Sequence, residues 1–215
     1  MKLNFVDKIY VCHCKSLVDR VEFIKNQLDR YNLEYNWVTS FDREDLSEDF
    51  LKEVMPLYDK DFNFLGMNRK LRIPEISIMM KHFVVWSDMV VNNITSALIL
   101  EDDILLTENF VEKFNNQIKD LSTDYDFVWI GSCCDMNLPF NDKHLIRRGM
   151  SRCAHGYLLN NKTARLLIEN YKYNNFPVDI YFNNIMQTLN LESYWMEPDL
   201  IRQSNSFETS IQNKF

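Results

Sequence analysis

Apolar residues follow two kinds of spacing along the chain, and these predict an alternation of strands and helices. Short β-prone or continuously apolar runs predict strands at 8–14, 35–38, 97–100, 127–130, 157–159 and 194–196. Apolar residues that repeat every three or four positions predict helices beginning near Ser16, Pro74, Thr107, Asn161 and Val178. We expect Ser16 and Thr107 to cap their helices. The strand–helix–strand opening predicts a right-handed βαβ unit and therefore an α/β domain.

Other segments carry weaker patterns. Residues 42–58 are acidic and amphipathic, with an apolar stripe formed by Leu46, Phe50, Val54 and Leu57. Residues 59–73 contain Gly66 and predict a loop, and a polar tail follows the last strand. No repeat, low-complexity stretch or Gly/Ser-rich linker divides the 215 residues. We therefore predict a single domain spanning residues 1–215.

Composition and charge exclude several function classes. The chain is 46% hydrophobic, which is enough for a sizeable core, and its net charge of −7 argues against a nucleic-acid partner. Its four glycines are dispersed, so they form neither a P-loop nor a dinucleotide fingerprint. The N-terminal residues lack the apolar run of a signal peptide, and no segment reaches the length of a membrane span. We therefore expect a cytoplasmic protein without a transmembrane segment.

The five cysteines are an odd number and are spaced as C-x-C and C-C pairs plus Cys153. These pairs lack the C-x-x-C spacing that is usual around one tetrahedral zinc ion. Together with the absence of a secretory signal, this favours reduced thiols in the core.

The most informative feature is a cluster of acids, Glu101, Asp102 and Asp103, directly after the apolar run 97–100. Ligands of open α/β sheets bind outside the carboxyl ends of the strands, where this cluster is expected to lie. Alternation along an extended chain predicts that Glu101 and Asp103 face one side and Asp102 the other. Two carboxylates on one side suit Mg²⁺ or Mn²⁺, which could also hold a diphosphate. The alternative is a solvated acidic turn before a helix whose N-terminus favours negative charge.

Other candidate residues are ambiguous on their own. Asp179 follows Pro177 at a predicted helix start, where a carboxylate needs no function beyond favouring the helix N-terminus. His82 lies within the apolar helix that begins near Pro74, where a satisfied core histidine is the alternative to a functional one.

Six short motifs in chain order resemble those of glycosyltransferase family 25, which includes bacterial lipooligosaccharide galactosyl- and glucosyltransferases and collagen β-galactosyltransferases. They extend over nearly the whole chain, and each is weak alone. In this sequence they are Ile9-Tyr10-Val11 with Asp19-Arg20, Pro74-Glu75-Ile76-Ser77 with His82 and Trp86, Leu98-Ile99-Leu100-Glu101-Asp102-Asp103, His155-Gly156-Tyr157 with Ala164, Phe176-Pro177-Val178-Asp179, and Glu197-Pro198 with Gln203 and Ser210-Ile211.

The resemblance implies a GT-A-type, Rossmann-like fold with a mixed, mostly parallel sheet flanked by helices. It also implies an inverting transfer of galactose or glucose from UDP-galactose or UDP-glucose to a hydroxyl acceptor on a glycan, a glycolipid or a protein such as a collagen-like chain. Such a transfer needs a base for the acceptor hydroxyl and a cation, Mn²⁺ or Mg²⁺, for the leaving diphosphate. On this basis the metal ligands are Glu101 and Asp103, and the donor contacts are Arg20, Asp102, Gln203 and Ser204. Asp179 is the base or a contact to an acceptor or donor hydroxyl, and the supporting residues are His82 and Glu75.

The sequence also departs from the family pattern. Ser77 and Lys81 stand where the family usually has Gly and Ser, and Ile180 and Tyr181 follow Asp179 where an acid pair is common. These departures keep open a catalytically degenerate member that binds a glycan or a partner. A metal-dependent phosphate-ester hydrolase built on the same carboxylates is a further alternative.

Overall fold

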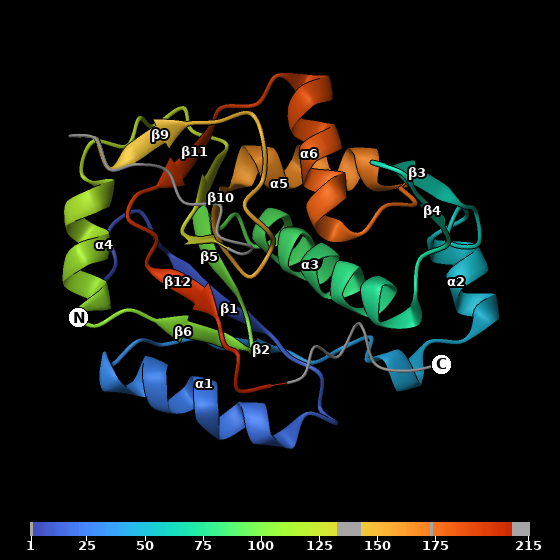
Figure 1. The fold of residues 1–215 in the computed structure, drawn as a ribbon, viewed down its shortest axis with the longest axis horizontal. Helices are drawn as coiled ribbons and strands as arrows, with labels where there is room; N and C mark the ends of the chain where they lie inside the picture. Colours follow the sequence, from blue (N-terminus) through green and yellow to red (C-terminus); the bar gives the residue numbers. More distant parts are fainter. Residues whose placement is uncertain (1, 133–142, 173, 208–215) are drawn as a thin grey trace.

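Seven strands form the central sheet of the computed structural model, which describes residues 2–132, 143–172 and 174–207 (Figure 1). Strands β5, β7 and β11 run in the same direction as β1 and β2, whereas β10 and β9 run in the opposite direction. The predicted fold class, a mixed and mostly parallel sheet flanked by helices, is therefore confirmed. The strand order is β2 (Asn36–Val38), β1 (Lys8–Cys12), β5 (Ser96–Glu101), β10 (Gly156–Asn160), β7 (Phe127–Trp129), β11 (Ser193–Met196) and β9 (Leu145–Arg147).

Helices cover both faces of this sheet, and the strand side chains alternate between two apolar cores. Ile99 of β5 packs in the core beneath α3 (Ile73–Val91), α5 (Asn161–Tyr171) and α6 (Val178–Leu189). Its neighbours Leu98 and Leu100 pack in the core beneath α1 (Val18–Arg30) and α4 (Phe110–Ile118). Because both faces are buried, β5 is apolar throughout until it reaches Glu101. This is why the run 97–100 predicts the strand correctly.

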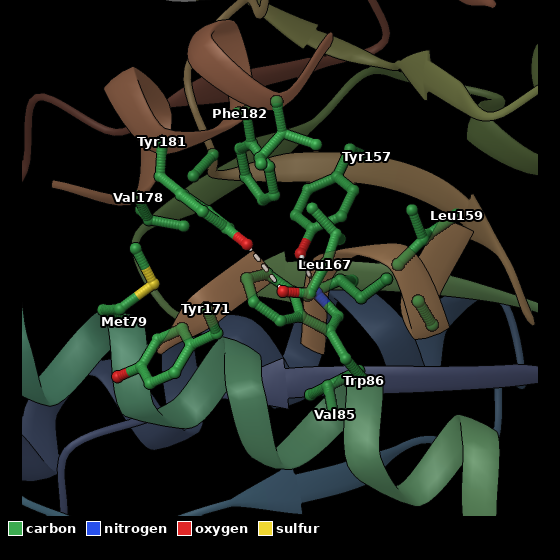
Figure 2. Packing of buried hydrophobic residues seen from close by; sticks show 14 of the residues in the cluster. Met79, Val85, Trp86, Tyr157, Leu159, Leu167, Tyr171, Val178, Tyr181 and Phe182 are labelled. Atoms are coloured by element: carbon green, nitrogen blue, oxygen red, sulfur yellow. Dashed lines mark hydrogen bonds between the residues drawn. The ribbon is translucent and has the colours of Figure 1, made fainter. Parts of the chain in front are cut away.

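The aromatic core beneath α3 joins this helix to β10 and α6 (Figure 2). Tyr157 of β10 is fully buried and accepts a hydrogen bond from Trp86 Nε1 at 3.2 Å. Tyr181 of α6 donates to the Leu167 carbonyl of α5 at 2.6 Å. Phe182 lies between them, with its ring centroid 5.1 Å from that of Tyr157. These contacts fix helix α3, which carries His82 and Lys81 toward the site described below.

Short elements were not predicted, because a few residues carry too little periodicity. The segment 59–73, expected to be a loop, contains a hairpin of β3 (Phe62–Phe64) and β4 (Met67–Arg69). Leu65 and Gly66 both have positive φ at its turn, as a two-residue type I′ connection requires. The acidic stretch forms a 3-10 turn (Arg43–Asp45) and α2 (Glu48–Val54). A three-stranded sheet of β6 (Ile104–Leu106), β12 (Ile201–Gln203) and β8 (Gly131–Ser132) also went unpredicted.

Both predicted helix caps are wrong. Helix α1 begins after Leu17, and the Ser16 hydroxyl instead donates to Glu44 Oε1 at 3.0 Å. Helix α4 begins after Asn109, which has left-handed backbone dihedrals. The backbone N–H of Thr107 donates to the Leu200 carbonyl at 3.0 Å, because the chain here leaves β6 alongside the segment that leads into β12. In both cases a tertiary contact engages the residue expected to act as a cap.

The prediction of reduced core cysteines holds for Cys12, holds for Cys14 only in that its thiol is free, since this residue is partly exposed, and fails for Cys153. Cys12 and Cys14 are free thiols, but Cys153 is disulfide-bonded, and Cys133 and Cys134 lie outside the described residues. A count of cysteines does not show which of them the fold brings together. Because disulfides are rare in reducing compartments, this bond gives no support to the cytoplasmic location, which stays a prediction. Among the described residues, none of the helices combines the length and the hydrophobicity of a membrane span.

Candidate active site

A pocket, here called the carboxylate pocket, lies where β1 and β5 end beside the first turns of α1 and α3. The two strands are parallel neighbours, and Cys12 is in register with Glu101, so the residues that follow both strands meet at one sheet edge. Its lining consists of Cys12, His13, Cys14, Leu17, Arg20, Arg43, Pro74, Ser77, Ile78, Lys81, Glu101, Asp102, Asp103 and Gln203. The structure thus brings together five of the nine predicted site residues.

Arg20 joins two of the acids. Its Nη1 lies 2.7 Å from Asp102 Oδ1 and 3.0 Å from Asp103 Oδ2, and the arginine is only 5% exposed. The chain turns at residues 102–103, so the strand alternation ends at Glu101. The expectation that Asp102 would face away from Asp103 is therefore wrong, because it extended a strand period through a turn.

Asp102 has both carboxylate oxygens engaged within the protein. Oδ1 pairs with Arg20, and Oδ2 lies 2.6 Å from His13 Nδ1. The ring of His13 in turn packs edge-on against Trp37 of β2, with centroids 5.2 Å apart. Asp102 therefore holds Arg20 and His13 in place, and its predicted contact with a donor nucleotide stays a prediction.

Asp103 has one oxygen engaged and one without a partner. Oδ2 accepts from Arg20 and lies 3.4 Å from Gln203 Nε2, whereas Oδ1 is buried with no hydrogen-bond partner among the described residues. Burial raises the pKa of Asp103, although Arg20 opposes this shift. The Asp103 carbonyl accepts from the Ser204 backbone N–H at 2.7 Å. Gln203 thus lines the pocket, while Ser204 lies outside its lining and anchors the backbone of Asp103.

Glu101 is the carboxylate with the strongest repulsion. Burial raises its pKa well above the ordinary value, and the negative charges of Asp103, Asp102 and Asp179 raise it further. Its side chain is 22% exposed, and Oε1 lies 3.7 Å from His82 Nε2. Arg20 is the cation bonded to this cluster, whereas Lys81 and Arg43, which also line the pocket, pair with Asp42 and Glu44.

His82 lies behind Glu101 on helix α3 and is fully buried. Its Nδ1 lies 2.8 Å from the Tyr157 hydroxyl. Burial lowers the pKa of His82 to about 3, so the imidazole is neutral at physiological pH. The predicted supporting position of His82 next to the carboxylates is thus the position found in the structure.

Asp179 and Glu75 lie near the pocket but do not line it. Asp179 is in the first turn of α6, its charge acts on Glu101, and burial raises its own pKa. Glu75 accepts two hydrogen bonds from Arg69, at 2.6 and 2.7 Å, and one from the Arg72 backbone N–H at 2.8 Å. Glu75 therefore fixes the start of helix α3 against strand β4.

Sequence reasoning missed three site residues. His13 bonds to Asp102, and Lys81 lines the pocket while its ammonium bonds to Asp42 and to the Ser40 carbonyl. The position of His13 directly after a predicted strand was an available signal, because residues after parallel strands gather at one edge. Asp42 carried no such signal, because it opens the acidic segment 42–58 and does not directly follow a predicted strand.

The carboxylates fit a divalent cation that is shared with a bound ligand. In the described residues no three His, Cys, Asp or Glu side chains are grouped so that they could hold a metal ion by themselves. Mg²⁺ and similar hard cations, however, are commonly held by one or two carboxylates together with substrate phosphates. Oδ1 of Asp103 is buried and has no partner among the described residues, and Glu101 is surrounded by like charges. These two carboxylates have the chemistry of such cation ligands.

A comparison with protein-family models identifies the family of this chain. Residues 6–182 match the family model described as glycosyltransferase family 25 (LPS biosynthesis protein). The chain belongs to glycosyltransferase family 25. The matched range contains β1, the acids at 101–103, His82 and Asp179, so the motif-based resemblance is confirmed.

Curated relatives in this family are longer proteins. A glycosyltransferase 25 family member from Aedes aegypti is 25% identical over 194 residues, which cover 83% of this chain and 31% of that protein. Procollagen galactosyltransferase 2 from Mus musculus is 26% identical over 137 residues, which cover 60% of this chain and 21% of that protein. The chain thus spans less than a third of these family 25 relatives. A solved glycosyltransferase involved in the glycosylation of the major capsid of PBCV-1 aligns over 94% of this chain and 93% of its own, with 10% identity and a TM-score of 0.46.

Proposed function

We propose that this family 25 chain transfers galactose or glucose from UDP-galactose or UDP-glucose to a hydroxyl acceptor, with inversion at the anomeric carbon and with Mn²⁺ or Mg²⁺. The observation that carries the proposal is the buried, unpartnered Oδ1 of Asp103 beside Glu101 in the carboxylate pocket. Three adjacent acids at a strand end gain nothing for folding alone, whereas their oxygens suit a cation that binds a diphosphate.

In this proposal Glu101 and Asp103 hold the cation. The bound cation supplies electrostatic stabilisation of the charge on the leaving UDP. Arg20 keeps Asp103 Oδ2 engaged, so that Oδ1 is the oxygen left for the cation. Gln203, which lines the pocket beside Asp103, is placed for a donor contact, while Ser204 holds the Asp103 backbone.

Asp179 is the proposed base for the acceptor hydroxyl. An inverting transfer in one displacement needs a carboxylate that takes this proton as the glycosidic bond forms. Burial raises the pKa of Asp179 toward the range in which a carboxylate is an effective base. Its charge acts on Glu101, so it lies close to the proposed donor side without lining the carboxylate pocket.

The acceptor class rests on the relatives alone. The family description names LPS biosynthesis, and the Mus musculus relative is named a procollagen galactosyltransferase. We therefore propose a glycan, glycolipid or protein hydroxyl as the acceptor and favour galactose as the first sugar to test.

The test is a panel of UDP-sugars assayed for Mn²⁺-dependent UDP release, with and without acceptors. We expect one UDP-hexose to be turned over and Asp103→Asn to lower the rate by about 100-fold or more, as the loss of several kcal/mol of charge stabilisation requires. Asp124→Asn, at an exposed acid outside the pocket, is the control and should leave the rate unchanged. An equal rate in the wild type and in a correctly folded Asp103→Asn variant would contradict the metal assignment.

A second candidate is a binding protein without catalysis. Ser77 and Lys81, which replace the usual family residues, both line the carboxylate pocket, so the departures fall on the site itself. Calorimetry separates the two candidates, because a decayed site would show no Mn²⁺-dependent heat on addition of UDP. Release of inorganic phosphate from phosphate esters, without sugar transfer, would instead indicate a hydrolase.

A further inference from the structure

Three buried side chains form a hydrogen-bonded chain that leads from the aromatic core to Glu101. Trp86 Nε1 lies 3.2 Å from the Tyr157 hydroxyl, and this hydroxyl lies 2.8 Å from His82 Nδ1 (Figure 2 shows the Trp86–Tyr157 bond). His82 Nε2 then lies 3.7 Å from Glu101 Oε1. Trp86, Tyr157 and His82 are all fully buried. We call these three residues the relay.

The direction of each bond follows from the chemistry of its groups. The indole N–H of Trp86 can only donate, so the Tyr157 oxygen is the acceptor of that bond. The Tyr157 hydroxyl, buried away from water, must itself donate, and His82 Nδ1 is the acceptor within reach. Since Nδ1 accepts, the neutral imidazole of His82 carries its proton on Nε2. The relay therefore selects one tautomer of His82.

We infer that Trp86, Tyr157 and His82 are positioning residues that aim the Nε2–H of His82 at Glu101 and so orient this carboxylate in the pocket. Within the described residues, the 3.7 Å approach to His82 is the one polar side-chain contact of Glu101. Movement of about 0.5 Å brings this distance within hydrogen-bond range. The other tautomer would place a lone pair of Nε2 against the carboxylate.

The role of the oriented Glu101 as a cation ligand rests on the proposed function. Residues that fix a metal ligand from behind typically change metal affinity or activity 10- to 100-fold when mutated. Holding Oε1 on the protein side leaves the second oxygen of Glu101 for the pocket, in the manner of Asp103, whose Oδ2 is held by Arg20. The pocket would then offer two carboxylates, each with one oxygen tied to the protein.

The direct test is the tautomer of His82, measured by two-bond ¹H–¹⁵N correlation spectra of the ¹⁵N-labelled full chain without added metal. We expect wild-type His82 to be protonated on Nε2, and we expect Tyr157→Phe to allow a mixture with the Nδ1–H form. Tyr181→Phe removes an equally buried hydroxyl from the same aromatic core and should leave the His82 signal unchanged. Protonation of wild-type His82 on Nδ1 would overturn the inference, as would an unchanged tautomer in Tyr157→Phe.

Paired substitutions of His82 provide a second test. His82→Gln keeps an N–H donor near the Nε2 position, whereas His82→Asn keeps polar atoms only near Nδ1. We expect His82→Asn and Tyr157→Phe to lower kcat by about 10-fold, with His82→Gln retaining more of the rate than His82→Asn. The reverse order, in variants with matched thermal unfolding, would overturn the inference. If the wild type turns over no UDP-sugar, the proposed function fails while the tautomer measurement still tests the relay.

Discussion

The ammonium group of Lys81 lies 2.5 Å from Asp42 Oδ1, and both side chains are buried. The pair joins helix α3 to the segment that precedes α2, at the wall of the carboxylate pocket. Lys81 also donates to the Ser40 carbonyl at 2.8 Å, and Asp42 also accepts from the Lys15 backbone N–H at 3.1 Å. Lys81, which departs from the family pattern, therefore has two acceptors for its ammonium group, Asp42 and the Ser40 carbonyl.

The first prediction concerns this ion pair. Lys81→Met removes the shorter of two ion pairs of the buried Asp42 and leaves it the Lys15 ammonium at 3.6 Å and the Lys15 backbone N–H. We therefore expect a loss of about 3 kcal/mol in the free energy of unfolding. Urea unfolding at pH 7, followed by tryptophan fluorescence, measures it. Lys52→Met, at an exposed lysine near Glu48 and Asp49, is the control and should cost less than about 1 kcal/mol.

A double variant identifies the cause of this loss. Asp42→Asn removes the carboxylate charge with which Lys81 pairs, so the double variant should be more stable than the sum of the two single losses indicates. Additive losses would show that the two charges do not interact and would contradict the prediction.

The second prediction concerns Arg20, which lies between Asp102 and Asp103. Arg20→Met leaves two adjacent buried carboxylates without this cation, and we expect a loss of about 3 kcal/mol or more in unfolding free energy. Mn²⁺ should then raise the melting temperature of the variant more than that of the wild type, because a bound cation replaces the missing positive charge. Thermal scans with and without Mn²⁺ measure both effects. An equal Mn²⁺ shift in the two proteins would argue against a cation at these carboxylates.

The third prediction concerns the pH dependence of stability at Glu101. Its pKa in the folded protein is raised above the ordinary value of 4.5, so folding penalises its charged form at neutral pH. Glu101→Gln should therefore stabilise the metal-free protein at pH 7, by about 1 kcal/mol, as is common for groups that serve a site rather than the fold. Urea unfolding in EDTA over a series of pH values is the measurement.

The sign of this effect fixes its pH window. As the pH falls through the raised pKa, the folded wild type binds a proton and loses the penalty, so the advantage of Glu101→Gln shrinks. Below pH 4.5 the folded and unfolded wild type are both protonated at this residue, and the advantage should be gone. Glu53→Gln, at an exposed acid on helix α2, provides the comparison. An advantage that grows on acidification would contradict the prediction.

Much of the fold could be predicted because its strands are buried on both faces. The run 97–100 has the continuous apolar pattern that a central strand requires, and α6 begins at Val178, as predicted. The position of Glu101 and Asp103 at the pocket follows from the same rule, because the acids come where β5 ends. The local sequence pattern was sufficient to predict an element wherever burial alone determines which residue types occur in it.

The remaining site contacts depend on tertiary structure that no local pattern reports. Asp42 is 39 positions from Lys81, and Arg20 is 82 positions from Asp102. The turn at residues 102–103 reversed the expected facing of Asp102, and the contact of Ser16 with Glu44 removed it from the helix cap. A polar side chain forms its hydrogen bonds with whichever partner the fold brings near it. The sequence could therefore predict the strand or helix on which such a residue lies, but not its partner.

The last prediction uses Cys14 as a reporter of the carboxylate pocket. Cys14 is a partly exposed free thiol on the pocket wall, 3.2 Å from the Ser16 hydroxyl, whereas Cys12 is buried and burial raises the pKa of its thiol. Iodoacetamide at pH 8 should therefore label Cys14 well before Cys12, as measured by mass spectrometry of tryptic peptides. UDP with Mn²⁺ should slow the labelling of Cys14 by about 10-fold when the ligand is at ten times its Kd, because only the unoccupied fraction reacts. UDP in EDTA is the control and should protect much less, and equal protection without the metal would contradict a cation held by Glu101 and Asp103.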